Sequence, residues 1–176
     1  MTDSTKDKHS AREQGLGYLY QPRLALLRLL ELAENTIVFL EKDDDLDFVD
    51  NNGNKSLSSL KHKAASDRLN DLSLDFWKSV RIWLARYKRG GRSVSNLRFF
   101  LFTTGTVSDS SFLKGFLPIQ SGKDDETQTL VEQAEDALRR SKSDLINDIE
   151  KEFNELTPAE KHDFLARIII FDGSPR

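Results

Sequence analysis

The sequence predicts an α/β fold with a mixed central sheet. Four short apolar or alternating runs typical of strands occur at Thr36–Leu40, Leu46–Val49, Ser56–Lys61 and Leu97–Thr104. Helical patterns precede the first run and separate the third from the fourth. A helix between a hairpin and a following strand implies a crossover connection, so we expect a mixed sheet covered by helices on both faces.

The first helix is expected over PRLALLRLLELA, from Pro22 to Ala33. Leu and Ala are strong helix formers, and Pro22 suits the first turn. Eight of the twelve residues are apolar, which predicts a helix that is buried on most sides. Residues 1–14 are polar and lack periodicity, so we interpret them as a mobile tail that precedes a single domain over 15–176.

The second and third strands are expected to form a hairpin, because Asn52-Gly53 between them is a strong turn signal. A two-residue loop would pair Asp44 with Lys61. A three-residue loop from Asn51 to Gly53 would pair Asp45 with Ser59 instead. The second register is favoured, because it gathers apolar residues on one face and leaves four polar ones on the other: Asp45, Asp47, Ser59 and Lys61.

The helix that precedes the fourth strand is expected from Ser73 to Tyr87, with Ser73 as N-cap and Gly90-Gly91 as the stop. Apolar residues at helical spacing define one face. Seven basic residues and no acid occur between Trp77 and Arg98, although the net charge of the chain is -3. A local basic strip can therefore contact phosphates. The candidates for DNA contact are Lys78, Arg81, Arg86, Arg89 and Arg92.

The last part of the chain is expected to be mostly helical. A short helix over Ser108–Phe116 precedes one long amphipathic helix with Leu130, Ala134, Leu138, Leu145, Ile149 and Phe153 on its stripe. Thr157-Pro158-Ala159-Glu160 has the spacing of a capping box and opens a last short helix. The strand from Ile168 to Phe171 follows. Nothing after it supplies cover, so we expect the chain to be the N-terminal part of a longer protein.

Composition excludes several classes of protein. The 176 residues include no cysteine and three histidines, which removes disulfides, thiolate metal sites and most zinc enzymes. No apolar run approaches the about 20 residues that span a bilayer. The N-terminus lacks the apolar region of a signal peptide. We therefore expect no membrane association and a cytoplasmic protein.

Acidic residues gather where the second strand begins. Between Glu41 and Asp50 there are six acids and one lysine, and the third strand ends at Lys61. Hairpin pairing brings the two stretches together. Carboxylates beside a lysine favour Mg²⁺ coordination and chemistry on a phosphate. An EF-hand is excluded, because Phe48 stands where the loop needs glycine and Asn54 where it needs glutamate.

These features resemble the PD-(D/E)xK restriction-endonuclease-like fold, whose core runs helix, three strands, helix, strand. The closer resemblance is to the double-stranded DNA endonuclease domain at the N-terminus of bacterial antiphage effectors, in CBASS and Lamassu-type systems. The resembling stretches, in order, are GYLYQPRLALLRLLE, FLEKDDDLDFV, SLKHK, LSLDFWKSVRIW, LFTTGTV and FLARIIIFDGSP. Here the helical C-terminal part would follow that core.

The resemblance implies roles for particular residues. Asp45 would bind the metal, Lys61 would be the catalytic lysine, and Gln21 would be the polar residue of the first helix near the metal. Ser59 stands where the family has Glu or Gln two residues before the lysine. Glu41, Asp44 or Asp47 would then supply the missing oxygen, or the site is weakened. The implied cofactor is Mg²⁺, for which Mn²⁺ is expected to substitute.

Two functions follow as expectations. The first is a metal-dependent endonuclease that cleaves double-stranded DNA in bacterial antiviral defence. The second is a degenerate nuclease fold that serves as a DNA-binding or oligomerisation module. For the first, cutting both strands requires two active sites, so a homo-oligomer is expected. A sensor domain or partner subunit outside this chain would control it.

Overall fold

The computed structural model describes residues 19–32, 35–63, 67–118 and 124–174. The expected tail at 1–14 lies outside this part of the chain. Within it, no helix is long and apolar enough to cross a membrane.

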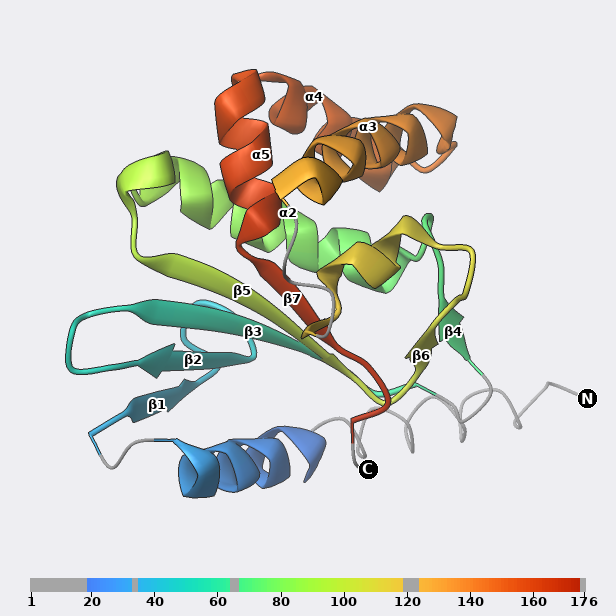
Figure 1. The fold of residues 1–176 in the computed structure, drawn as a ribbon. Coiled ribbons are helices and arrows are strands. Elements are labelled where there is room, and N and C mark those ends of the chain that lie inside the picture. Colours follow the sequence, from blue (N-terminus) through green and yellow to red (C-terminus); the bar gives the residue numbers. More distant parts are fainter. Residues whose placement is uncertain (1–18, 33–34, 64–66, 119–123, 175–176) are drawn as a thin grey trace, which may run out of the picture.

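A five-stranded mixed sheet in the order β1-β2-β3-β5-β7 forms the centre of the fold (Figure 1). The antiparallel part consists of β1 (Ile37–Leu40), β2 (Leu46–Val49) and β3 (Lys55–Lys61). β5 (Leu97–Thr103) runs parallel to β3, and β7 (Ile168–Phe171) runs parallel to β5. The predicted α/β class and mixed sheet are confirmed.

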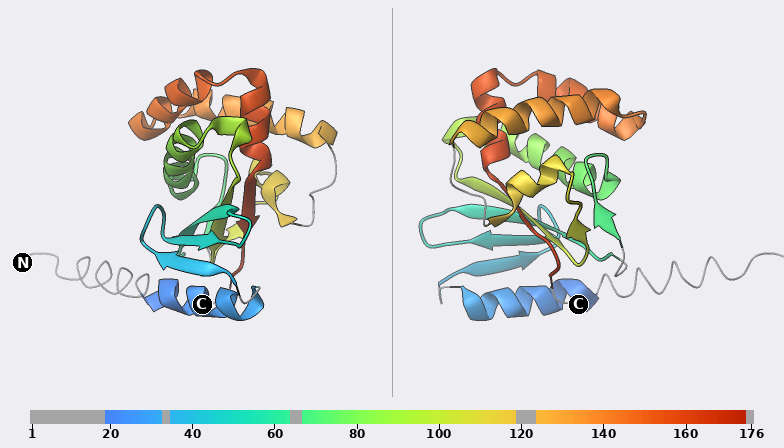
Figure 2. Two further views of the ribbon diagram at one scale, coloured as in Figure 1. Left: turned by 90° about the vertical axis from the view of Figure 1, so that its left-hand side faces the viewer. Right: turned by 45° about the vertical axis from the view of Figure 1, so that its right-hand side comes forward.

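Helices cover both faces of this sheet, as Figures 1 and 2 show. A helix that includes residues 19–31 lies on one face, over a core cluster that contains Leu46, Phe48 and Leu60. The opposite face carries the larger core. It is covered by the remaining helices: α2 (Leu74–Arg89), α3 (Asp124–Arg140), α4 (Asp144–Asn154) and α5 (Pro158–Ala166).

The first helix is less buried than its composition suggested. Tyr20, Leu24 and Ala25 face the sheet and are buried, whereas Leu26 and Leu30 are 60% and 79% exposed. The prediction of burial on most sides is wrong, because this helix packs against the sheet alone and has no described neighbour on its outer side (Figure 2).

Helix α2 follows the sequence signals closely. Its N-cap is Ser73, and its buried face includes Trp83 and Tyr87. Gly91 adopts a φ of 93°, in the left-handed region where glycine is unstrained, and so ends the helix. A 3₁₀ turn, η1 (Arg92–Val94), then leads into β5.

Two short elements were not expected. β4 (Arg68–Leu69) and β6 (Thr106–Val107) form a separate two-stranded parallel sheet. The predicted helix over Ser108–Phe116 is a 3₁₀ turn, η2 (Phe112–Phe116), whose N-cap Ser111 accepts a hydrogen bond from the Leu113 N–H. Its position after β6 brings Phe112 and Phe116 onto Phe76 of α2.

The expected long C-terminal helix is two helices. α3 ends at Arg140 and α4 begins after its N-cap Ser143, which has extended backbone. Both halves bury residues of the stripe, Leu138 before the break and Ile149 after it. The chain bends because each half packs its own stripe into the same core, which one straight helix cannot do.

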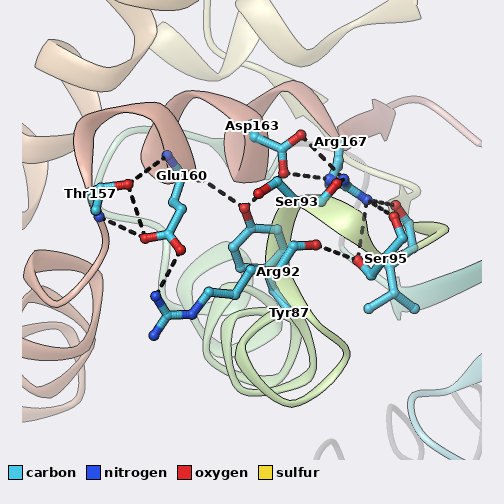
Figure 3. Close-up of polar contacts among 9 residues, drawn as sticks. Tyr87, Arg92, Ser93, Ser95, Thr157, Glu160, Asp163 and Arg167 are labelled. Carbon is cyan, nitrogen blue, oxygen red and sulfur yellow. Dashed lines mark hydrogen bonds and ion pairs between the residues drawn. The ribbon is translucent and has the colours of Figure 1, made fainter.

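The start of α5 confirms the capping box. Thr157 accepts from the Glu160 N–H, and Glu160 accepts from the Thr157 N–H (Figure 3). Further along the helix, Asp163 accepts hydrogen bonds from the Tyr87 hydroxyl at 2.7 Å and from Arg167 at 2.9 Å. Arg167 also donates to the backbone oxygens of Ser93, Ser95 and Leu97, so α5 is tied to α2 and to the start of β5.

Strand β7 is covered on both faces by this chain. Ile168 and Ile170 are buried on the helical side. On the other side, Phe171 stacks on Phe102 at 4.8 Å, and the Arg28 guanidinium lies over both rings. The expectation that the strand would lack cover is therefore wrong.

Candidate active site

The β2–β3 hairpin has the three-residue loop. The Gly53 N–H donates to the backbone carbonyl oxygen of Asp50 at 3.0 Å, and Gly53 has a φ of 75°. Leu46 lies opposite Ser58 in the register. Over the paired residues, which end at Leu46, this is the register of the three-residue loop, so the favoured register is confirmed and the one that would pair Asp44 with Lys61 is excluded.

Three of the predicted site residues meet at the end of this hairpin. The Gln21 amide nitrogen donates to Asp45 Oδ1 at 3.2 Å. The Lys61 Nζ lies 3.9 Å from Asp45 Oδ2, which also accepts the Leu60 N–H at 2.7 Å. The side chains of Lys61 and Asp45 are 22% and 27% exposed. A carboxylate, an amide and an ammonium group thus lie together within reach of solvent.

Asp44 is hydrogen-bonded to Ser59 of β3 and Trp83 of α2. Its carboxylate accepts hydrogen bonds from Ser59 Oγ at 2.8 Å, from Trp83 Nε1 at 2.7 Å and from the Asp45 N–H at 3.0 Å. Burial raises the pKa of Asp44, and the hydrogen bonds from Trp83 and Ser59 oppose that shift. Asp44 therefore joins the turn before β2 to β3 and to α2.

Asp45, Asp47, Ser59 and Lys61 were expected on one face of the hairpin, and this expectation is wrong for Asp45. Strand pairing between β1, β2 and β3 ends at Leu46, and residues 41–45 form bends. Alternation therefore no longer fixes where side chains point, and Asp44 rather than Asp45 contacts Ser59. Asp45 instead turns toward the first helix, where Gln21 lies.

Two further acids of the cluster are held by cations. Asp47 is fully buried, and Lys55 Nζ lies 3.2 Å from its Oδ2. Lys55 also pairs with Asp43, which Arg86 of α2 contacts at 2.5 Å. The hydrogen bond from Lys55 lowers the pKa of Asp43, whereas burial raises the pKa of Asp47. Asp43 therefore joins the turn before β2 to α2, whereas Asp47 pairs within the hairpin.

The last predicted ligand, Glu41, lies in the turn before Asp45. Its φ is 49°, and its backbone N–H donates to the backbone carbonyl oxygen of Asp45 at 3.0 Å. Across residues 19–32, 35–63, 67–118 and 124–174, no three His, Cys, Asp or Glu side chains are grouped closely enough to hold a metal ion. Of the four predicted metal ligands, Asp45 is the one that lies beside Lys61 and Gln21.

The predicted DNA-contacting residues divide into two sets. Lys78, Arg81 and Arg89 are exposed along α2. Arg86 is paired with Asp43, and Arg92 is paired with Glu160 at 2.7 Å (Figure 3). The first set is therefore available to a ligand, and the second stabilises contacts between elements.

Sequence reasoning did not find the role of Trp83. Its place on the apolar stripe predicts a core residue, and the side chain is indeed fully buried. A buried indole N–H generally needs an acceptor, which signals a polar partner without identifying it. That partner is Asp44, 39 positions earlier in the chain.

Comparison with known proteins gives no relative from which a role could be transferred. No protein-family model matches this sequence, and no curated protein sequence matches it.

Proposed function

We propose that this chain is a metal-dependent endonuclease domain that cleaves double-stranded DNA, with a role in bacterial antiphage defence. The observation that carries the proposal is the meeting of Gln21, Asp45 and Lys61, which come from the first helix, the turn before β2 and the end of β3. The element order supports it as well. Apart from the two-residue strand β4 before α2, the first part of the chain runs helix, three antiparallel strands, helix and parallel strand, and the resemblance to PD-(D/E)xK nucleases rests on this order.

The site offers one carboxylate, and among the described residues no three acidic or histidine side chains are grouped to hold a metal ion, so a magnesium ion here would take most of its ligands from water and substrate. Mg²⁺ is commonly bound through one or two carboxylates, with water and substrate phosphate as the other ligands. Asp45 would supply the carboxylate and Gln21 an amide oxygen, after its amide turns from the present hydrogen bond. Such an ion polarises a phosphate and its attacking water.

The protein groups have separate tasks in this mechanism. Lys61 holds its ammonium beside Asp45, where it can orient a water and stabilise charge that develops on the phosphate. Asp44 would act indirectly, through its hydrogen bonds to neighbouring residues. It fixes the backbone N–H of Asp45 and the hydroxyl of Ser59, and thereby positions Asp45. The exposed Lys78, Arg81 and Arg89 would contact the DNA backbone.

The alternative is a degenerate nuclease fold that binds DNA or assembles without cutting. Ser59 favours it, because a serine replaces the family's Glu or Gln and its hydroxyl donates to Asp44. In this reading Asp45 and Lys61 form only a partly exposed ion pair, which is worth about 0–1 kcal/mol.

Divalent-ion binding separates the two readings. We would titrate the protein with Mg²⁺ and with Mn²⁺ by calorimetry, beside Asp45→Asn and the control Asp148→Asn, whose acid is 68% exposed on α4. The proposal predicts binding that Asp45→Asn abolishes and Asp148→Asn retains. It also predicts nicking of supercoiled plasmid that EDTA stops. If no ion binds in a way that depends on Asp45, and Mn²⁺ supports no cleavage, the nuclease proposal is wrong and the degenerate nuclease fold is the better account.

A further inference from the structure

The outer side of the first helix is an apolar surface. Five leucines at helical spacing lie on this side, with exposed fractions between 38% and 79%: Leu19, Leu26, Leu27, Leu29 and Leu30. Pro22 and Arg23 are exposed on the same side. We call these seven residues the leucine face. An isolated exposed leucine needs no explanation, but a contiguous set commonly marks an interaction site.

The leucine face is not the packing surface of the domain. The helix meets the sheet through its opposite side, where Tyr20, Leu24 and Ala25 are buried. No described element lies on the outer side in either view of Figure 2. Among the residues that the structure describes, none packs on the leucine face.

The size of the leucine face suits a pair of like surfaces. Side chains of this size and exposure present roughly 500 Å² of apolar surface, within the range of functional patches. Two such faces, if fully covered, together bury at most about 1,000 Å² from these side chains, which is the lower limit for a specific interface. A small symmetric dimer is therefore within reach of this surface alone.

The charges at the two ends of the helix are complementary. Arg23 is exposed in the first described turns, and Glu31, 51% exposed, lies in the last turn, where Arg28 of the same chain contacts it at 2.7 Å. Eight residues separate Arg23 from Glu31, about 12 Å along the axis, so they do not pair within one chain. In an antiparallel pair of these helices centred near Leu27, Arg23 of each copy meets Glu31 of the other.

We propose that two copies of this chain associate through their leucine faces, with the first helices antiparallel about a two-fold axis near Leu27. Such an interface is isologous, because each copy contributes the same surface. Gln21 lies on the same helix, so the two candidate sites flank the interface. The proposal does not depend on nuclease activity, since it rests on exposure and charge alone.

Sedimentation velocity over a range of concentrations tests the interface. The wild-type chain should dimerise reversibly, and the double variant Leu26→Lys with Leu30→Lys should raise the dissociation constant at least about tenfold. Val94→Lys is the matched control, since Val94 is 85% exposed on η1 and outside the leucine face. Circular dichroism and thermal melting establish that each variant is folded.

The charge pair gives a second test that is specific to the antiparallel arrangement. Arg23→Glu alone and Glu31→Arg alone should each weaken the dimer, and the two together should restore it. A wild-type chain that stays monomeric at every concentration would overturn the proposal. So would a dimer that tolerates Leu26→Lys with Leu30→Lys, or a double charge reversal that fails to restore association.

Discussion

The ammonium of Lys61 lies 3.9 Å from the carboxylate of Asp45. Lys61 ends β3, and Asp45 directly precedes β2, so the hairpin register sets their approach. Gln21 reaches the same carboxylate from the first helix. The candidate site thus depends on a helix, a turn and a strand end that the fold brings together.

Replacement of Asp44 by alanine should destabilise the protein by about 2–4 kcal/mol, because it leaves buried donors without an acceptor. Those donors are the Trp83 indole N–H and the Ser59 hydroxyl. Urea unfolding, followed by tryptophan fluorescence, measures the change in unfolding free energy. The control Asp148→Ala, at an exposed position, should stay within about 0.5 kcal/mol of wild type. An equal effect of the two variants would show that the Asp44 hydrogen bonds contribute nothing.

The pH dependence of stability should carry the signature of Asp44. Burial raises its pKa above the ordinary value of 3.8, so the folded protein keeps a proton that the unfolded chain releases. The contribution of this group to stability is then lost as the pH rises above about 4. Asp44→Asn does not titrate, so its stability deficit relative to wild type should shrink as the pH rises.

Asp50 provides a comparison of opposite sign. Hydrogen bonds from Asn54 lower the pKa of Asp50, so its contribution is present above pH 3.8 and lost as the pH falls. The deficit of Asp50→Asn should therefore grow as the pH rises. Urea titrations between pH 3 and pH 7 measure both differences. Parallel curves for the two variants would contradict the assignments.

DNA affinity should depend on the exposed basic residues of α2. The combined change of Lys78, Arg81 and Arg89 to alanine is expected to weaken binding to every sequence equally. It should lower the salt slope of the binding constant by roughly 0.9 for each phosphate that the protein no longer neutralises. Fluorescence anisotropy at several salt concentrations measures this slope.

Arg86→Ala should behave differently, because Arg86 pairs with Asp43 inside the fold. Its main effect is expected on unfolding free energy, with the salt slope of DNA binding close to wild type. An unchanged slope in the triple variant would place the DNA-binding surface elsewhere on the molecule.

Much of this fold could be predicted because local patterns decided it. The apolar alternation of Leu46, Phe48 and Leu60 selected one hairpin register, and the structure has that register. The capping box at Thr157 and Glu160 set the start of α5. In each case the residues that form the sequence pattern are the same residues, or the paired strand, whose structure the pattern predicts.

Other features depended on long-range packing that no local pattern encodes. Leu26 and Leu30 look like core residues in the sequence and are exposed, because burial depends on how many elements reach the helix. The break at Ser143 was hidden because the apolar stripe continues on both sides of it. Asp44 could not be placed, since the chain leaves strand geometry just before β2.

Plasmid cleavage by Lys61→Ala tests most directly whether Gln21, Asp45 and Lys61 form a nuclease site. We would compare initial nicking rates in Mg²⁺ or Mn²⁺ for wild type, Lys61→Ala and the control Lys142→Ala, an exposed lysine between α3 and α4. With melting curves showing all three folded, removal of the Lys61 ammonium should slow nicking by on the order of 10²-fold or more. Lys142→Ala should cut like wild type. Equal nicking rates for wild type and Lys61→Ala would contradict the proposed site.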